Sequence, residues 1–388
     1  METDKTLPAG PRVRAGCSYL PDALAAVEEL AAAIGQPESG LVIIFASSRY
    51  ELDRLGAELE ARFAPATVIG CTTAGEIGPA GYLEGGLSGV SIHRDDITFE
   101  VALLPSLTDF VFGAGKMLAQ KMKEKLGQRV PGLLPEEAFA FMLIDGLCAR
   151  EEVVTRAFYD GLGGIALIGG SAGDDLGFVE TGVLYDGRFV SDAALLLVAT
   201  TPFLFEVFKT QHFVSGNQRM VVTAAIPEKR IVTEINGCPA AEEYARAVGR
   251  DLDRLDSMVF AAYPVVVRIG NADFVRSIQK MNPDGSLTFY CAIDDGIVFK
   301  VAQGVDMVDN LAAALEAVGQ RIGPPALILG CDCILRHLES KQRGLRERIG
   351  ALLAGCNVVG FSTYGEQYGG MHINQTFTGV AIGRERRP

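Results

Sequence analysis

The sequence contains no apolar run approaching the roughly 18 consecutive residues that a helix needs to span a bilayer. Its longest apolar stretches, such as residues 193–200, have the length of buried strands. The first ten residues, METDKTLPAG, also lack the basic start and apolar centre of a signal peptide. We therefore expect a cytoplasmic protein that does not enter a membrane.

Positive charge is in the minority as well, since 35 lysines and arginines stand against 48 aspartates and glutamates. The formal net charge is -13, so the chain offers no basic face to the phosphates of a nucleic acid or of an anionic membrane. The eight cysteines are irregularly spaced among 388 residues, which does not match a disulfide scaffold. We expect reduced thiols and no nucleic-acid partner, and the length predicts two domains.

Fingerprints of common enzymes and cofactors are also absent. The sequence has no GxGxxG, P-loop, HExxH or CxxCH motif. Cys71 lacks the spacing of a nucleophile elbow, and only four histidines are present to activate a thiol. Cys331 and Cys333 are closer together than the cysteines of structural zinc sites. We interpret all three as core cysteines, and a redox or metal role for the close pair stays open.

What the sequence does contain is an internal repeat. At a constant offset of 290, Gly70, Thr73, Gly75, Glu76, Gly89, Val90 and Ile92 match Gly360, Thr363, Gly365, Glu366, Gly379, Val380 and Ile382. Each copy runs as strand, helix, strand, glycine-rich acidic turn and further strands, and a weaker third copy ends at residues 165–175. This pattern predicts an α/β fold of mixed sheets flanked by helices, built from repeated strand–helix–strand units in two domains.

A new set of strand-like segments begins near residue 202. We therefore place an N-terminal tail at residues 1–14, a first domain at 15–203 and a second domain at 204–388.

The glycine-rich turns follow the carboxyl ends of strands, where α/β folds usually bind ligands. Glycine permits tight turns, and short hydroxyl groups hold either a turn or a ligand. We expect a cleft lined by Thr72, Thr73, Gly75, Glu76, Ser362, Thr363, Tyr364, Glu366, Asn374 and Thr376. The alternative is that these hydroxyls and carboxylates only cap neighbouring backbone amides, and the sequence leaves both interpretations open.

The four histidines differ in their surroundings. His337 lies in the charged stretch LRHLESKQR, where we expect it to be solvated, and His93 should lie at a surface strand end. His212 shares a strand face with aromatic and short polar residues. His372 follows the second Gly-Glu turn and alternates with Asn374. A histidine among short polar groups is the strongest candidate for metal ligation or proton transfer.

Two segments of the repeat resemble a known family. Residues 68–92, VIGCTTAGEIGPAGYLEGGLSGVSI, resemble the signature of the FIST N domain, and residues 357–383, NVVGFSTYGEQYGGMHINQTFTGVAIG, resemble that of the FIST C domain. The two expected domains would then be FIST N-like and FIST C-like. The resemblance implies a sensory module that binds small ligands, amino acids among them.

The resemblance extends to stand-alone bacterial nitric oxide sensors of this family, which bind haem b non-covalently through a histidine. It implies nitric oxide as the ligand and a histidine kinase or a cyclic-di-GMP enzyme as the partner. Neutral imidazole is a common axial ligand to haem iron. His372 is the first candidate for this ligand and the metal-binding residue, His212 is the second, and Tyr82 stays open.

Two other functions are alternatives to the haem sensor. A binding module for an amino acid or another metabolite would use the threonines, Glu76, Glu366 and the segment 374–376 without haem. An enzyme centred on Cys71 or on a carboxylate pair is disfavoured, because the sequence shows no nucleophile–base pattern. A homodimer is left open.

Overall fold

The computed structural model describes residues 10–269 and 272–387. Three repeated units and one inserted sheet make up this part of the chain. The first unit contains β1 (Val13–Ser18), α1 (Ala23–Ile34), β2 (Ser39–Ser47), α2 (Leu52–Phe63), β3 (Thr67–Thr73), β4 (Glu76–Gly78), β5 (Gly81–Leu83) and β6 (Leu87–His93). Residues 1–9 of the expected tail lie outside the described residues, and residues 13 and 14 already belong to β1.

The second and third units repeat this order. The second contains β7 (Thr98–Pro105), α3 (Phe112–Arg129), β8 (Ala138–Ile144), α4 (Glu151–Leu162), β9 (Ala166–Ser171), β10 (Val183–Tyr185), β11 (Arg188–Val190) and β12 (Ala193–Thr200). The third contains β13 (Phe203–Gln211), α7 (Met307–Ile322), β22 (Leu327–Cys333), α8 (Ile334–Gln342), α9 (Arg346–Gly355), β23 (Val358–Thr363), β24 (Glu366–Tyr368), β25 (Met371–Ile373) and β26 (Thr376–Arg386). The predicted mixed α/β architecture of repeated units is confirmed.

Each unit completes its six-stranded sheet with a hairpin from another unit. The hairpin β4–β5 of the first unit pairs with β23 of the third, and β24–β25 of the third pairs with β9 of the second. The hairpin β10–β11 of the second unit pairs in turn with β3 of the first. This cyclic exchange interlocks the three units, so that the glycine-rich turns preceding the hairpins meet at the centre.

One glycine of the repeat is required by backbone packing. A Cβ atom at Gly70, Gly169 or Gly360 would lie 2.0, 2.1 or 1.8 Å from the carbonyl oxygen of Ile44, Met142 or Gly330 on the neighbouring parallel strand. No side chain fits at that distance, so all three units keep glycine there. The equivalent glycine in the middle unit confirms the weaker third copy.

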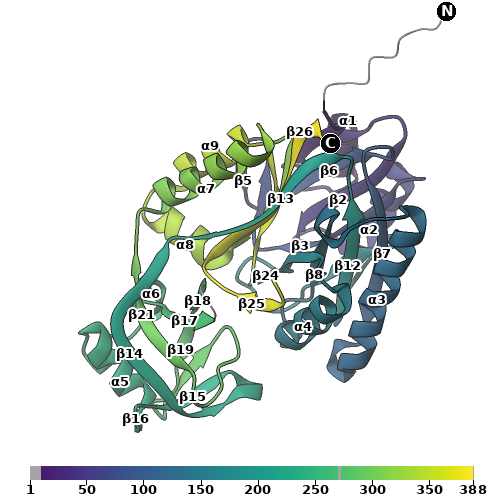
Figure 1. The fold of residues 1–388 in the computed structure, drawn as a ribbon. Helices are drawn as coiled ribbons and strands as arrows, with labels where there is room; N and C mark the ends of the chain where they lie inside the picture. The colour runs from purple at the N-terminus through teal and green to yellow at the C-terminus, as the bar shows by residue number, and fades with distance from the viewer. Residues whose placement is uncertain (1–9, 270–271, 388) are drawn as a thin grey trace, which may run out of the picture.

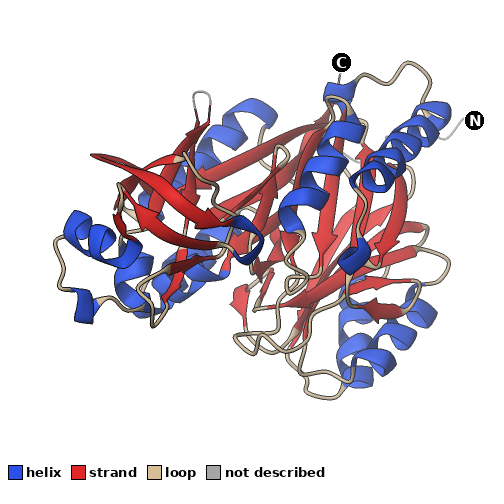
Figure 2. Ribbon diagram, turned by 90° about the horizontal axis from the view of Figure 1, so that it is seen from below, coloured by secondary structure: helices blue, strands red, loops and turns tan. Residues whose placement is uncertain are grey.

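The inner faces of the three sheets share one hydrophobic core. Phe45 and Phe361, from the first and third units, stack there with ring centroids 4.8 Å apart. The outer faces pack against helices, including α1 and α2 on the first sheet, α3 and α4 on the second, and α7 and α9 on the third (Figures 1 and 2).

The inserted sheet interrupts the third unit between β13 and α7. It contains β14 (Phe213–Ile226), β15 (Ile231–Ile235), β16 (Cys238–Pro239), α5 (Ala240–Val248), α6 (Ser257–Ala262), β17 (Val265–Ile269), β18 (Ala272–Arg276), β19 (Ile278–Met281), β20 (Leu287–Phe289) and β21 (Val298–Gly304). It has its own hydrophobic core, and Figure 1 shows it beside the body formed by the three units. The contact between this sheet and the body brings together a histidine, a cysteine, two glutamates and an arginine.

Candidate functional site at the junction of the inserted sheet

The residues expected to line a cleft are buried instead where the three turns meet. All ten, from Thr72 to Thr376, are buried, including Tyr364 at 7% exposure. The turns bond to one another through their backbones: Ala74 N–H donates to the carbonyl oxygen of Ser362 at 2.9 Å, and Ser362 N–H donates to that of Gly75 at 2.7 Å. These turns therefore join the units, and their polar groups face protein.

Glu76 and Glu366 fasten the hairpins that follow them. Glu76 Oε2 accepts a hydrogen bond from Gly86 N–H at 2.9 Å, and Glu366 Oε2 accepts one from Thr376 N–H at 3.2 Å, at the same offset of 290. The hydroxyl groups of Thr73 and Thr376 donate to the same two carboxyl groups. Burial raises the pKa of Glu76 to about 7 and raises that of Glu366 as well. These contacts match the capping interpretation of the two carboxylates.

His212 lies in the link between β13 and the inserted sheet, and both of its ring nitrogens have partners. Nε2 lies 2.8 Å from Glu339 Oε2, and Nδ1 lies 2.9 Å from a guanidinium nitrogen of Arg336. Arg336 also pairs with Asp332, which accepts a hydrogen bond from the Tyr82 hydroxyl. His212 and Tyr82 are thus parts of a buried polar network.

The expectation that His337 is solvated is wrong. Its side chain is 4% exposed, because α8 packs against the hairpin β4–β5 and sets the ring edge-on against Tyr82. His337 Nε2 lies 3.3 Å from Glu84 Oε1. His93 is also buried, at 6% exposure, at the end of β6.

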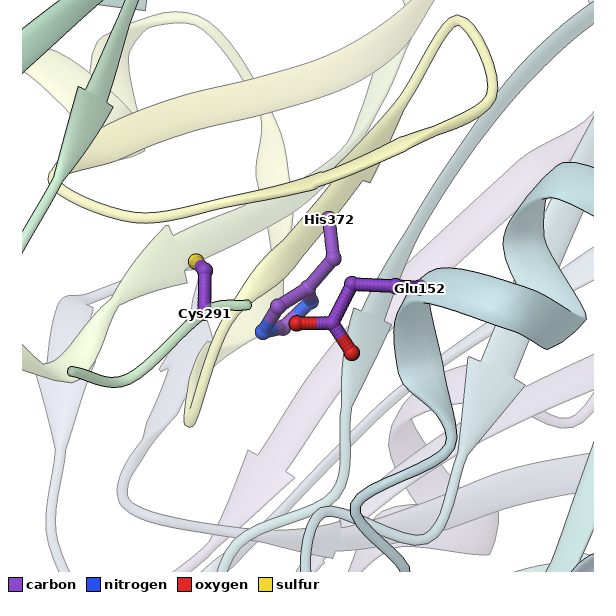
Figure 3. Close-up of side chains that lie close together, drawn as sticks. All are labelled: Glu152, Cys291 and His372. Carbon is purple, nitrogen blue, oxygen red and sulfur yellow. The ribbon is translucent and has the colours of Figure 1, made fainter. Parts of the chain in front are cut away.

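His372 lies in a different environment, between the body and the inserted sheet. It comes from β25, and its ring meets Glu152 from the first turn of α4 and Cys291 from the segment after β20. One ligand atom from each of the three side chains lies within 4.8 Å of the others (Figure 3). Asn374 joins them, since its Oδ1 accepts a hydrogen bond from Cys291 Sγ at 2.7 Å.

Ion pairs and backbone hydrogen bonds hold this junction closed. Glu152 Oε1 accepts a hydrogen bond from Ala292 N–H at 2.7 Å, and Glu152 Oε2 lies 2.8 Å from the Arg230 guanidinium. Arg230 also pairs with Glu151 at 2.6 Å and donates to the carbonyl oxygen of Tyr290 at 2.8 Å. The two carboxylates suit the first turn of α4, where the helix dipole favours negative charge.

His372 is neutral in this setting. Burial lowers the pKa of His372 to about 3, and the guanidinium groups of Arg230 and Arg276 act in the same direction, while Glu152 opposes them. Its Nδ1 lies 3.2 Å from Gln367 Nε2. Burial also raises the pKa of the Cys291 thiol to about 12, so that it is protonated near neutral pH.

Buried amide groups near His372 lack partners. Among the described residues, nothing bonds to Asn374 Nδ2, to Gln367 Oε1 or to either polar atom of the Gln375 side chain. Gln375 also has a φ of 57°, a left-handed conformation that the repeat fills with Gly85, φ 74°, in the first unit. Unpaired buried polar groups and strained backbone are both costly, and they concentrate at functional sites.

Sequence profiles of two domains match the chain. The FIST N domain profile matches residues 40–238, and the FIST C domain profile matches residues 240–369. The chain belongs to the FIST family. FIST domains are sensory modules of signal transduction, which generally signal to partner proteins.

Two known proteins are similar to this FIST chain. An uncharacterized protein of Methanocaldococcus jannaschii is 23% identical over 381 residues, covering 87% of this chain and 73% of its own length. The crystal structure of cyanuric acid hydrolase from A. caulinodans aligns with 96% of this chain and 99% of its own, at 10% identity and a TM-score of 0.38. A TM-score that low supports no functional inference. No helix within the described ranges has the length and apolar character required to cross a membrane.

The packing around His372 does not fit a haem in this conformation. A haem slot needs apolar walls and an open face on the imidazole. Here Glu152 and Cys291 lie beside the ring, and the backbone of Gly365 lies against it, so that a Cβ atom on Gly365 would be 2.2 Å from His372 Cε1. His212 fits no better, because both of its nitrogens already have partners.

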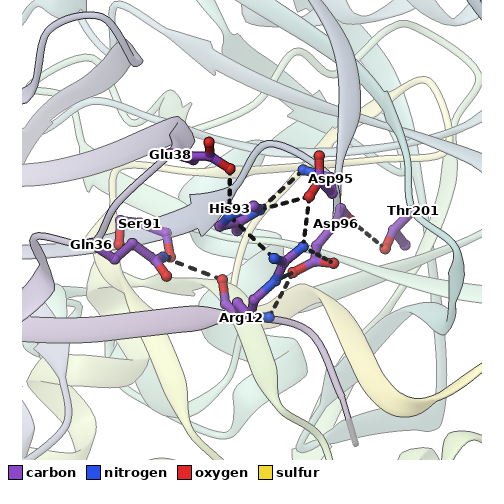
Figure 4. Close-up of polar contacts among 8 residues, drawn as sticks. All are labelled: Arg12, Gln36, Glu38, Ser91, His93, Asp95, Asp96 and Thr201. Carbon is purple, nitrogen blue, oxygen red and sulfur yellow. Dashed lines mark hydrogen bonds and ion pairs between the residues drawn. The ribbon is translucent and has the colours of Figure 1, made fainter. Parts of the chain in front are cut away.

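A second group of possible ligands, Glu38, His93 and Asp95, lies at the far end of β6. The guanidinium of Arg12 lies 3.2 Å from His93 Nε2 and 3.1 Å from Asp95 Oδ2, and Asp95 N–H donates to His93 Nδ1 at 3.2 Å (Figure 4). His93 and Asp95 therefore already interact with the Arg12 cation, at the place where a metal ion would have to bind.

Sequence reasoning found His372 and Asn374 but missed Glu152 and Cys291. Glu152 belongs to AREEVV, which reads as an ordinary helix start, and Cys291 is one of eight irregularly spaced cysteines. They lie 139 positions apart in sequence (291 minus 152), and only the docking of the inserted sheet on α4 brings them together. Cys71, Cys331 and Cys333 are buried, as predicted for core thiols.

Proposed function

We propose that this FIST protein is a sensor whose small ligand binds at the junction between the inserted sheet and the body, beside His372. The observation that carries this proposal is the set of unpartnered buried amide atoms on Gln367 and Asn374, which lie beside a neutral imidazole, and on Gln375, which follows Asn374 in the chain. A polar ligand would satisfy these groups and offset the free energy that they cost. We expect binding without catalysis.

Signal output would follow from movement of the inserted sheet. Two links join this sheet to the body, and they are held together where Val305 N–H donates to the carbonyl oxygen of His212 at 2.8 Å. A ligand that changes the contacts among Glu152, Cys291 and His372 would shift the equilibrium between closed and open junctions. The partner would then distinguish the two states, and a histidine kinase or a cyclic-di-GMP enzyme is the partner class we propose.

The nitric oxide version of this proposal places haem b at His372. Its support is the neutral imidazole of His372. It requires more room than the closed junction offers. An absorption spectrum of protein expressed with adequate haem decides this version: a stoichiometric Soret band that shifts with nitric oxide and weakens in His372→Ala supports it, and a colourless protein that takes up no haem rejects it.

The version without haem takes an amino acid or a related metabolite. Its support is the local pairing of charges, because Arg276 and Arg230 could meet a carboxylate while Glu151 and Glu152 could meet an ammonium group. The test is a thermal-shift screen of the full chain with amino acids, in parallel with Gln375→Gly. A ligand that raises the melting temperature of the wild type alone supports this version, and equal shifts in both proteins reject the site.

A further inference from the structure

We propose that Glu152, Cys291 and His372 bind one divalent transition-metal ion directly, without a haem. One carboxylate, one thiolate and one imidazole form a mixed donor set suited to Zn²⁺ and similar ions. This inference names a ligand for the junction, and it rests on the proposed function for its role in signalling but not for the binding itself.

The distances allow a metal site after a small contraction. The three donor atoms lie within 4.8 Å of one another, whereas ligands about 2.0–2.3 Å from a tetrahedral ion lie roughly 3–4 Å apart. Side-chain movements of about 1 Å close this difference. The donors come from α4, β25 and the inserted sheet, so a bound ion would fasten the sheet to the body (Figure 3).

Two buried amides near the donors would change their hydrogen-bonding roles in the same event. A metal needs Cys291 as a thiolate, which accepts hydrogen bonds but no longer donates one to Asn374 Oδ1. Rotation of the Asn374 amide would then aim its unpartnered Nδ2 at the sulfur. A metal also needs the lone pair of His372 Nε2, which places the proton on Nδ1.

Rotation of the Gln367 amide provides for that proton. Its unpartnered Oε1 would move to the place of Nε2, 3.2 Å from His372 Nδ1 and 2.9 Å from Ser171 Oγ. Oε1 could accept hydrogen bonds from both groups, at the expense of the 3.3 Å contact with the carbonyl oxygen of Gly365. Amides that orient the ligands in this way form the outer shell of metal sites in general.

The charges balance when the ion binds. Binding releases the Cys291 proton to solvent, and the thiolate and the Glu152 carboxylate then offset the two positive charges of the ion. Arg230 does not take up all of the negative charge, because it is shared with Glu151. Three protein ligands leave a fourth position for water or a small ligand, as in zinc sites that are not purely structural.

Cobalt binding tests this inference on the full chain. Chelator-stripped protein is titrated with Co²⁺, and thiolate-to-cobalt charge transfer and metal stoichiometry are measured, followed by Zn²⁺ competition. We expect one Co²⁺ per chain with a charge-transfer band that Cys291→Ser abolishes. Gln367→Met should weaken Co²⁺ binding about 10–100-fold, as expected for an outer-shell partner.

Matched controls separate this site from other donors. Cys238→Ser removes an exposed cysteine of the same sheet, and His93→Asn removes the histidine of the Arg12 cluster; both should bind Co²⁺ as the wild type does. If near-ultraviolet circular dichroism shows that Cys291→Ser is not folded, Glu152→Gln and Gln367→Met are tested in its place. Co²⁺ uptake without charge transfer in the wild type, or an unchanged affinity in folded junction variants, overturns the inference. If the protein binds the metal but neither the metal nor a small molecule changes the activity of a partner protein, the signalling proposal is overturned and the metal site stands.

Discussion

Glu152 accepts a hydrogen bond from the backbone amide of Ala292 at 2.7 Å, across the boundary between the body and the inserted sheet. The sheet therefore docks on the N-terminus of α4 through a charged helix turn. Arg230 lies on the other side of the same carboxylate and also pairs with Glu151. The contact is polar, and its strength depends on the Arg230 cation together with the two carboxylates.

Arg230→Met should destabilise the junction strongly. The substitution leaves the buried carboxylate of Glu151 and the partly exposed carboxylate of Glu152 without their cation, and breaking a buried pair costs about 3–5 kcal/mol. We expect faster hydrogen exchange at residues 290–292 and a lower urea midpoint. Arg268→Met is the matched control, since Arg268 forms its ion pair with Asp273 at the surface. Equal exchange at residues 290–292 in wild type and Arg230→Met would show that these ion pairs do not hold the sheet.

Gly360→Ala should be among the most damaging single-methyl changes in the chain. The added Cβ would lie 1.8 Å from the carbonyl oxygen of Gly330, so β22 and β23 would have to separate. We expect a loss of at least about 3 kcal/mol in unfolding free energy, or no soluble protein. Gly319→Ala, in α7 with open space around it, should instead gain up to about 1 kcal/mol. A mild effect at Gly360 would contradict the structural explanation of the repeat.

The offset of 290 and the glycine-rich turns were enough to predict the repeated units, because each unit has a strong local pattern. The hairpin exchange was not predictable, since three-residue strands such as β4 and β24 carry no signal that names their partner sheet. His337 shows a similar limit: its polar helix reads as solvated, but the hairpin of another unit covers it. His372 was identified from its neighbours on one strand, whereas Glu152 and Cys291 depend on a contact between distant segments.

Gln375→Gly should stabilise the protein while removing part of its ligand site. In the wild type, the left-handed backbone and the buried amide without partners both cost free energy. Removing both should gain more than glycine loses through the greater chain entropy of the unfolded state. We expect a gain of about 1–2 kcal/mol in urea unfolding. Gly85→Ala is the reciprocal control in the first unit, and it should be destabilising because its φ is 74°. A loss of stability in Gln375→Gly would mean that the Gln375 side chain is satisfied.

The contribution of Glu76 to the stability of the protein should fall as pH rises from about 4.5 to 7. Burial raises the pKa of Glu76 to about 7 in the folded state, so between these values the folded state holds a proton that the unfolded state has lost. The stability that Glu76 contributes is fully present below its pKa in the unfolded state, and it is lost as pH rises through its pKa in the folded state. A shift of this size corresponds to roughly 3 kcal/mol.

Glu76→Gln isolates this contribution. The amide can accept from Gly86 N–H and bond to Thr73 without ionising. The unfolding free energy of Glu76→Gln relative to that of the wild type should therefore be more favourable at pH 8 than at pH 5 in urea unfolding. The variant keeps the contributions of Glu366, whose pKa burial raises, and of His372, whose pKa burial lowers, and these two contributions have opposite signs. Identical pH profiles would show that Glu76 ionises freely.

Native mass spectrometry of the full chain, purified gently from cells, tests the central claim most directly. A site at the junction predicts a bound mass, whether metal ion, metabolite or haem, that is present in the wild type and lost in the double variant His372→Ala with Gln375→Gly. The His93→Asn control should retain it. A bound mass that survives in the folded double variant, or a wild-type chain that carries nothing and gains nothing on incubation with metal, amino acids or haem, would contradict the account.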